Sequence, residues 1–173
     1  MSTPSKELSH SEQFESWMSL YANDVLRTCY LILRDTALAE DAFQDTFLKV
    51  WKYRETFAGK NNCSARTWIV RIATNTCRDY LKSSWFRRRK SERSLDDITM
   101  PIDAPQDASE IYLDILNLPE KYRVVVILFH YQQFSKCEIA ATLHISRAAV
   151  ARRLTKAYML LNYTVEDVTN RES

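Results

Sequence analysis

Side chains suited to binding nucleic acid recur along the stretch "ARTWIVRIATNTCRDYLK" (65–82). Arg71, Asn75, Arg78 and Lys82 follow one another at steps of four, three and four residues, so on a helix they share one face. Guanidinium and amide groups bind phosphates and base edges, and Arg and Asn can each hold a base through two hydrogen bonds. A solvated basic face is the alternative, but the cluster "RRRK" that follows favours nucleic acid.

A second candidate is the stretch "ISRAAVARRLTKAY" (145–158). Helical spacing gives it one apolar stripe, and its cations and small residues lie on or beside the opposite face. This face could enter a DNA groove, with the alanines against thymine methyl groups. The side chains expected to face or flank the groove are Arg147, Ala148, Ala149, Ala151, Arg152, Arg153, Thr155 and Lys156.

The residues before this stretch predict a helix-turn-helix. Ser135 and Glu138 form a capping box ahead of the short segment "KCEIAATL", the link "HI" is tight, and Ser146 can cap the next helix. The first helix of such a pair braces against the DNA backbone and the second lies in the major groove. A plain helical hairpin has similar spacing, but the serine cap, the alanines and the cations favour DNA.

No residue cluster suggests catalysis, a cofactor or a metal. The four cysteines lack a Cys-x-x-Cys pair, the three histidines have no carboxylate partners at ligand spacing, and no Gly-rich phosphate loop occurs. Cys29 and Cys77 fall on apolar faces, where free buried thiols are common. We therefore expect a protein that is not an enzyme and that needs no cofactor.

The elements that carry these residues are expected to be all-α. A chain of 173 residues with one glycine and 46% apolar residues has little provision for the turns of a β-rich fold. The segment "SLDDITMPIDAPQDAS" has prolines and acidic residues without a helical stripe, which is typical of a linker. We expect two small helical domains, at 10–90 and 107–165, joined by a flexible acidic linker at 91–106, with four helices in the second. Ser64 is expected to cap the helix that follows it, and Pro119 to be the first residue of its helix.

The charge of the chain is segregated along its length. Residues 60–93 carry ten cations and two anions, whereas residues 94–120 carry seven anions and no cation. The N-terminal stretch lacks the layout of a secretory signal, and the apolar run "VVVILF" is far below the roughly 20 residues that span a bilayer. We expect a cytoplasmic protein without membrane insertion.

Several stretches together resemble the bacterial extracytoplasmic-function (ECF) sigma factors, which give RNA polymerase its promoter specificity. In the first half they are "AEDAFQDTFLKVW" (39–51) and the stretch 65–82; in the second they are "LPEKYRVVVIL" (118–128) and "EIAATLHISRAAVARRLTKA" (138–157). The resemblance spans roughly residues 10 to 165. It implies two helical domains, no catalytic chemistry, and three partners: core RNA polymerase, promoter DNA and an anti-sigma factor.

The resemblance also implies roles for individual residues. The helix of Asp41, Gln44, Asp45, Leu48 and Trp51 is similar to the surface that docks on the clamp helices of the polymerase. The helix-turn-helix corresponds to the part that reads the minus-thirty-five element as duplex. The residues that correspond to the part capturing the melted minus-ten element are Lys60, Asn61, Asn62, Ser64, Arg71, Asn75 and Arg78.

Two departures from the family pattern concern the second half. Phe134 stands where the family usually has a glycine, and Ala151 and Arg152 stand where it favours a cation followed by serine. The promoter sequence therefore cannot be copied from relatives. A stand-alone regulator that binds duplex DNA tightly without polymerase, and an enzyme such as a nuclease, are the alternative hypotheses.

Overall fold

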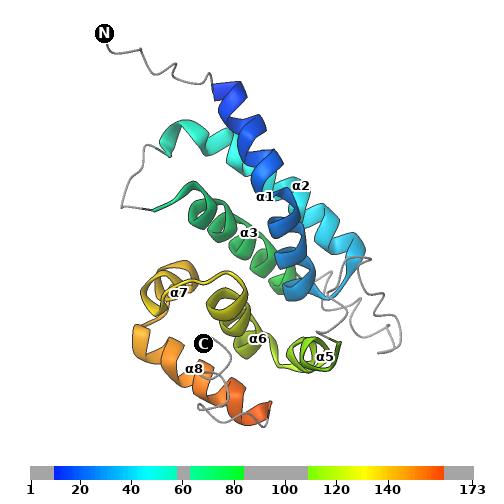
Figure 1. Cartoon of the computed structure of the whole chain (residues 1–173), viewed down its shortest axis with the longest axis vertical. Helices are drawn as coiled ribbons and strands as arrows, with labels where there is room; N and C mark the ends of the chain where they lie inside the picture. The colour runs from blue at the N-terminus through cyan, green and yellow to red at the C-terminus, as the bar shows by residue number, and fades with distance from the viewer. Residues whose placement is uncertain (1–9, 58–62, 84–108, 162–173) are drawn as a thin grey trace.

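The computed structural model describes residues 10–57, 63–83 and 109–161, and these are helical with no strand among them. The first half forms the upper body in Figure 1, in which the three long helices pack on one another. Its elements are α1 (His10–Leu33), α2 (Thr36–Tyr53), the short 3-10 helix η1 (Arg54–Thr56) and α3 (Ala65–Lys82).

The second half forms the lower body. The four helical segments expected there are present, and the tight link 144–146 joins the last two. Its elements are α5 (Ser109–Asn117), α6 (Glu120–Val126), the π-helix η5 (Ile127–Tyr131), α7 (Lys136–Leu143) and α8 (Arg147–Leu160).

Local capping explains where these helices begin. Asp35 lies between α1 and α2 and caps the start of α2, because its side chain accepts a hydrogen bond from the N–H of Leu38 at 3.0 Å. The predicted caps at Ser64, Ser135 and Ser146 are confirmed, because each serine accepts a backbone N–H of the first turn that follows it. The capping box at Ser135 is complete.

Two details differ from expectation. Pro119, predicted as the first residue of its helix, is the N-cap, and the helix begins one residue later at Glu120. The helix that follows widens into a π-helix, in which the N–H of Gln132 reaches the carbonyl of Ile127, five residues back, at 3.0 Å. Gln133 then takes φ 58° and turns the chain toward α7.

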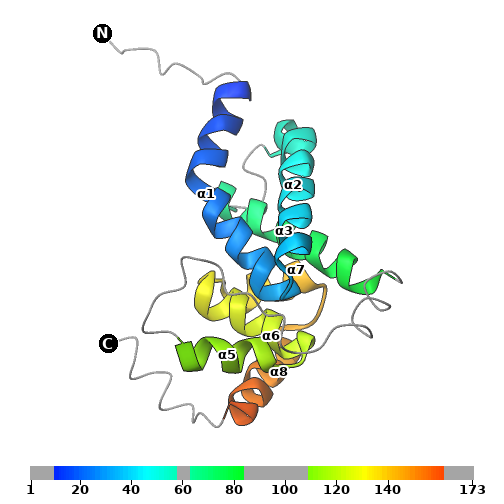
Figure 2. The same ribbon diagram turned by 90° about the vertical axis from the view of Figure 1, so that its right-hand side faces the viewer.

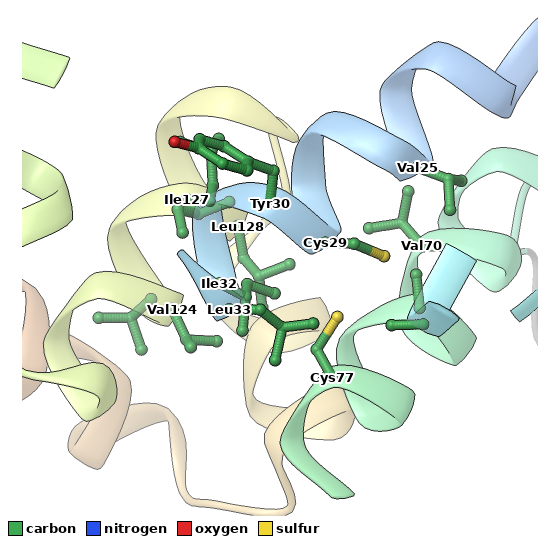
Figure 3. Close-up of a cluster of buried hydrophobic side chains, with 14 of the residues drawn as sticks. Val25, Cys29, Tyr30, Ile32, Leu33, Val70, Cys77, Val124, Ile127 and Leu128 are labelled. Atoms are coloured by element: carbon green, nitrogen blue, oxygen red, sulfur yellow. The ribbon is translucent and has the colours of Figure 1, made fainter. Parts of the chain in front are cut away.

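One hydrophobic core spans both halves. The lower end of α1 lies beside α6 (Figure 2). In Figure 3, Ile32 and Leu33 of α1 lie among Val124, Ile127 and Leu128 of α6 and η5. The two bodies are therefore packed against each other through apolar side chains.

The buried thiols predicted at Cys29 and Cys77 are confirmed, because both are fully buried and free. Figure 3 shows them between α1 and α3. Burial, together with the hydrogen bond that the Cys77 thiol donates to Cys29, raises the pKa of Cys77 well above its ordinary value. The Cys77 thiol therefore stays protonated and belongs to the core. No helix within the described ranges has the length and apolar character needed to cross a membrane.

Candidate nucleic-acid interface

The predicted minus-ten face lies on α3, on the side toward α7. Arg71, Asn75 and Arg78 are half-buried there. The Nε of Arg71 donates to Thr142 Oγ1 at 3.2 Å, and an Nη of Arg78 lies 3.5 Å from the carbonyl oxygen of Leu143. Part of the donor capacity of this face is therefore used within the chain.

The remaining minus-ten candidates flank the start of α3. Ser64 is exposed, and its hydroxyl is occupied as the cap of α3, accepting the N–H of Thr67 at 3.1 Å. Lys60, Asn61 and Asn62 lie outside the described residues. An aromatic cluster holds the chain just before these residues, because Phe57 stacks on Trp68 at a centroid distance of 4.9 Å.

The second predicted DNA face is the outer side of α8. Its apolar stripe is buried through Val150, Leu154 and Ala157. The side chains on the other side remain accessible, as a groove-binding face requires. Exposed are Arg147, Ala148, Arg152, Thr155 and Lys156, and half-buried are Ala149, Ala151 and Arg153.

Helix α8 is held in place by the rest of the helix-turn-helix domain. Helices α6 and α7 both pack against it. His130 Nε2 and the hydroxyl of Tyr158 lie 2.6 Å apart, which ties η5 to the last turns of α8. His144 ends α7 with φ 55° and lies exposed in the tight link. These contacts fix the direction in which the outer face points.

The predicted polymerase surface lies on α2. Asp41 and Gln44 are exposed, and Leu48 and Trp51 are 66% and 41% exposed. Asp45 accepts a hydrogen bond from the hydroxyl of Tyr80 at 2.7 Å. The ring of Trp51 packs against Phe14 and Arg54 on one part of its surface, and the exposed side chains form a mixed acidic and apolar surface.

Sequence reasoning missed the polar residues that join the two halves. Gln132, at 1% exposed, accepts from Arg66 at 2.7 Å and donates to the hydroxyl of Thr28 at 2.5 Å. Arg123, at 5% exposed, donates to the carbonyl oxygen of Ile32 at 2.8 Å. The one available signal was Arg123 itself, a cation inside the apolar run "YRVVVIL".

The described part of the chain contains no group of three or more His, Cys, Asp or Glu residues that could hold a metal ion. The groups gathered at these surfaces are guanidinium, ammonium, amide and hydroxyl donors. Such donors bind phosphates and base edges.

Comparison with known proteins identifies the family. Residues 17–87 match the model of sigma-70 region 2, and residues 110–161 match that of sigma-70 region 4. The chain is 27% identical over 177 residues to the ECF RNA polymerase sigma factor SigW of Bacillus subtilis, with 91% of each chain covered. The chain belongs to the ECF sigma factors. It directs transcription initiation by RNA polymerase.

Further comparisons agree with this assignment. The RNA polymerase sigma-E factor of Streptomyces avermitilis is 28% identical to this sigma factor over 167 residues, covering 92% of this chain and 89% of the relative. Sigma factor RpoE in complex with the anti-sigma factor NepR from Bartonella quintana has the same fold, with a TM-score of 0.67 at 20% identity over 87% of this chain and 97% of that one. CnrH in complex with the cytosolic domain of CnrY gives a TM-score of 0.60 at 20% identity, over 94% and 91% of the two chains.

Proposed function

We propose that the two halves of this sigma factor divide promoter recognition between them. The first half, whose face contains Arg71, Asn75 and Arg78, captures the melted minus-ten element. Extruding a base costs a few kcal/mol, and a preformed row of guanidinium and amide donors can offset that cost. The second half reads the minus-thirty-five element as duplex through α8.

The observation that best supports this division is the exposure of the outer face of α8. Arg152, Thr155 and Lys156 are exposed side by side while the opposite stripe is buried. Arg152 is the long donor nearest the middle of the face, where it can bind a guanine edge through two hydrogen bonds. Arg147 and Arg153 on the flanks bind phosphates.

The α2 surface of Asp41, Gln44, Leu48 and Trp51 docks on the clamp helices of core RNA polymerase in this proposal. Two exposed apolar side chains beside acidic and amide groups suit a protein partner better than DNA. The same surface explains why a sigma factor acts only as a subunit. We also place the protein in the cytoplasm, where core polymerase acts, and propose no catalytic site for it.

An anti-sigma factor completes the proposal. Two solved proteins with the same fold were captured with partner chains, one with the anti-sigma factor NepR and one with the cytosolic domain of CnrY. We extend that kind of partner to this chain.

The test is run-off transcription. Core polymerase with this protein is expected to initiate at defined sites in a genomic promoter library, whereas core polymerase alone is not. Arg152→Ala should weaken selection by about 1–3 kcal/mol at one position of the upstream element, with Lys121→Ala, an exposed cation on α6, as the matched control. Failure to initiate anywhere in the library contradicts the proposed function.

Asn75→Ala separates the roles of the two halves. It should reduce promoter opening, measured by permanganate reactivity of unpaired thymines, while binding to core polymerase stays unchanged. Equal loss of polymerase binding in Asn75→Ala and Arg152→Ala would mean that the faces are misassigned.

A further inference from the structure

Trp51 is the aromatic side chain of the predicted polymerase surface, and two neighbours hold its ring. The rings of Phe14 and Trp51 meet edge to face, with centroids 5.0 Å apart; the end of α2 that carries Trp51 lies beside α1 in Figure 2. The guanidinium carbon of Arg54 lies over the indole, 3.7 Å from the ring centroid. The ring is therefore fixed by two contacts, although Trp51 remains exposed.

The guanidinium group of Arg54 is already occupied within the chain. One Nη donates to the carbonyl oxygen of Trp51, and the other lies 3.5 Å from Oε1 of Glu55. The Nε is enclosed and has no hydrogen-bond partner among the described residues. Attraction between the guanidinium and the π face of the indole offsets the cost of enclosing this group. Only 16% of the Arg54 side chain is exposed, so it offers little surface to a phosphate or to an acidic partner.

The short helix η1 fixes the backbone that carries Arg54. The N–H of Phe57 donates to the carbonyl oxygen of Arg54 at 3.1 Å. Phe57 is held in turn by rings from two helices, because it stacks on Trp68 at a centroid distance of 4.9 Å and meets Trp17 edge to face at 5.4 Å. A cation beside the last carbonyl groups of α2 is also favoured by the negative end of the helix dipole. Arg54 therefore reaches Trp51 from a turn that the aromatic side chains of α1 and α3 hold in place.

An exposed tryptophan that is held in one orientation suits the recognition of a protein. Tryptophan is enriched among the residues that contribute most to protein–protein affinity. A side chain that is already ordered loses less conformational freedom on binding than a mobile one. Leu48, three residues before Trp51, lies on the same face of α2 and is also exposed. The orientation of the indole therefore decides how these two apolar groups meet a partner.

Building on the proposed docking of α2, we propose that Arg54 is a positioning residue for the binding of core polymerase. Trp51 makes the contact with polymerase, and Arg54 holds the indole against Phe14 in the orientation that polymerase binds. Arg54 itself makes no contact with polymerase. Without the guanidinium the ring is free to move, and polymerase binding must then order it.

A double-mutant cycle on the affinity for core polymerase separates positioning from direct contact. Arg54→Met keeps an unbranched stem but removes the guanidinium, and it should weaken binding about fivefold, which corresponds to ordering one large side chain. Trp51→Ala should weaken binding more. In the Trp51→Ala background, Arg54→Met should weaken it no further, because the ring on which Arg54 acts is gone. A direct contact between Arg54 and polymerase would instead give the same loss in both backgrounds.

Lys52→Met is the matched control. Lys52 is a cation in the same turn of α2, and its ammonium lies 5.4 Å from the centroid of the Tyr53 ring. The substitution therefore removes the same kind of contact from a ring that is not part of the predicted polymerase surface. The change in affinity that Lys52→Met causes should be the same with and without Trp51→Ala.

Fluorine NMR of the full chain labelled with fluorotryptophan observes the ring directly. The Trp51 resonance is assigned by its loss in Trp51→Phe. Arg54→Met should shift and narrow this resonance, whereas the resonances of Trp17 and Trp68 should keep their positions; Lys52→Met should change none of the three. Arg54→Lys keeps the charge without the planar group and should also weaken polymerase binding. It is the second variant if circular dichroism shows that Arg54→Met does not fold.

Three results overturn the positioning role: a Trp51 resonance that Arg54→Met leaves unchanged, a loss of affinity from Arg54→Met that persists in the Trp51→Ala background, or a coupling to Trp51 as large for Lys52→Met as for Arg54→Met. If Trp51→Ala weakens polymerase binding and Arg54→Met does not, the positioning role fails and the docking of α2 stands. If Trp51→Ala binds polymerase as tightly as the parent, the docking of α2 fails and the positioning role fails with it.

Discussion

Arg123→Met tests how strongly the second half depends on the first. The guanidinium is almost fully buried and donates to the carbonyl oxygens of Leu118 at 2.7 Å, Leu116 at 3.3 Å and Ile32 at 2.8 Å. Burial, with repulsion from Arg34 second, lowers its pKa to about 10. The side chain therefore remains a cation at neutral pH, and methionine keeps an unbranched apolar stem without the charge.

The expected loss of stability is the difference between two opposing effects. Hydrogen bonds from a charged donor contribute about 2 kcal/mol each, so three of them give roughly 6 kcal/mol. Removing the cation relieves a burial cost of roughly 3 kcal/mol, because a pKa unit corresponds to about 1.4 kcal/mol. We expect Arg123→Met to lower the free energy of unfolding by about 3 kcal/mol.

Urea unfolding followed by two signals measures how much Arg123→Met lowers the free energy of unfolding and whether the loss extends to the first half. Circular dichroism reports the helices of both halves, whereas all four tryptophans, at positions 17, 51, 68 and 85, precede the second half. Because Arg123 bonds Ile32, the fluorescence midpoint should fall together with the dichroism midpoint. The control is Arg152→Met, an exposed arginine on α8. A loss no larger than in the control, or a fluorescence transition that does not move, refutes the reasoning.

The remaining predictions concern single contacts. Ser146→Ala should cost about 1 kcal/mol by urea unfolding, because it removes the cap that accepts the N–H of Ala149 at 3.0 Å; Ser135→Thr, which keeps a capping hydroxyl, should cost less. Burial and the hydrogen bond to Asp45 raise the pKa of Tyr80 above 10, so the folded state keeps this proton where the unfolded state releases it. The contribution of protonated Tyr80 to the free energy of unfolding should therefore be fully present below pH 10 and decrease as pH rises above it. Tyr80→Phe should make this decrease shallower. Trp51→Ala should weaken binding to core polymerase at least tenfold in a fluorescence titration without changing the folded circular dichroism; unchanged affinity would remove Trp51 from the proposed docking surface.

The sequence was sufficient for features that depend on near neighbours. The caps at Ser64, Ser135 and Ser146 follow from a serine placed just before a helical stripe, and the structure confirms all three. The all-α fold followed in the same way from the helical stripes and the single glycine. Capping and helical periodicity involve residues within one or two turns of each other, so both patterns can be recognised in a single sequence.

Features that depend on distant contacts could not be predicted. Gln132 is separated from Thr28 by 104 positions, and nothing near it in the sequence indicates that an amide there is buried. The π-helix that positions it has no local sequence rule. The hydrogen bond that Asp45 accepts from Tyr80 also depends on the packing of α2 against α3. The coverage of Arg71 and Arg78 by α7 likewise requires the packed structure.

The junction between the halves also bears on how the protein behaves when concentrated. The surfaces that meet within one chain are equally complementary between two copies, so the second half of one molecule can pack on the first half of another. A tether of the length of 84–108 keeps a chain's own partner at an effective concentration of about millimolar. Exchanged dimers therefore compete only in protein solutions near that concentration, and in dilute solution each chain pairs with itself.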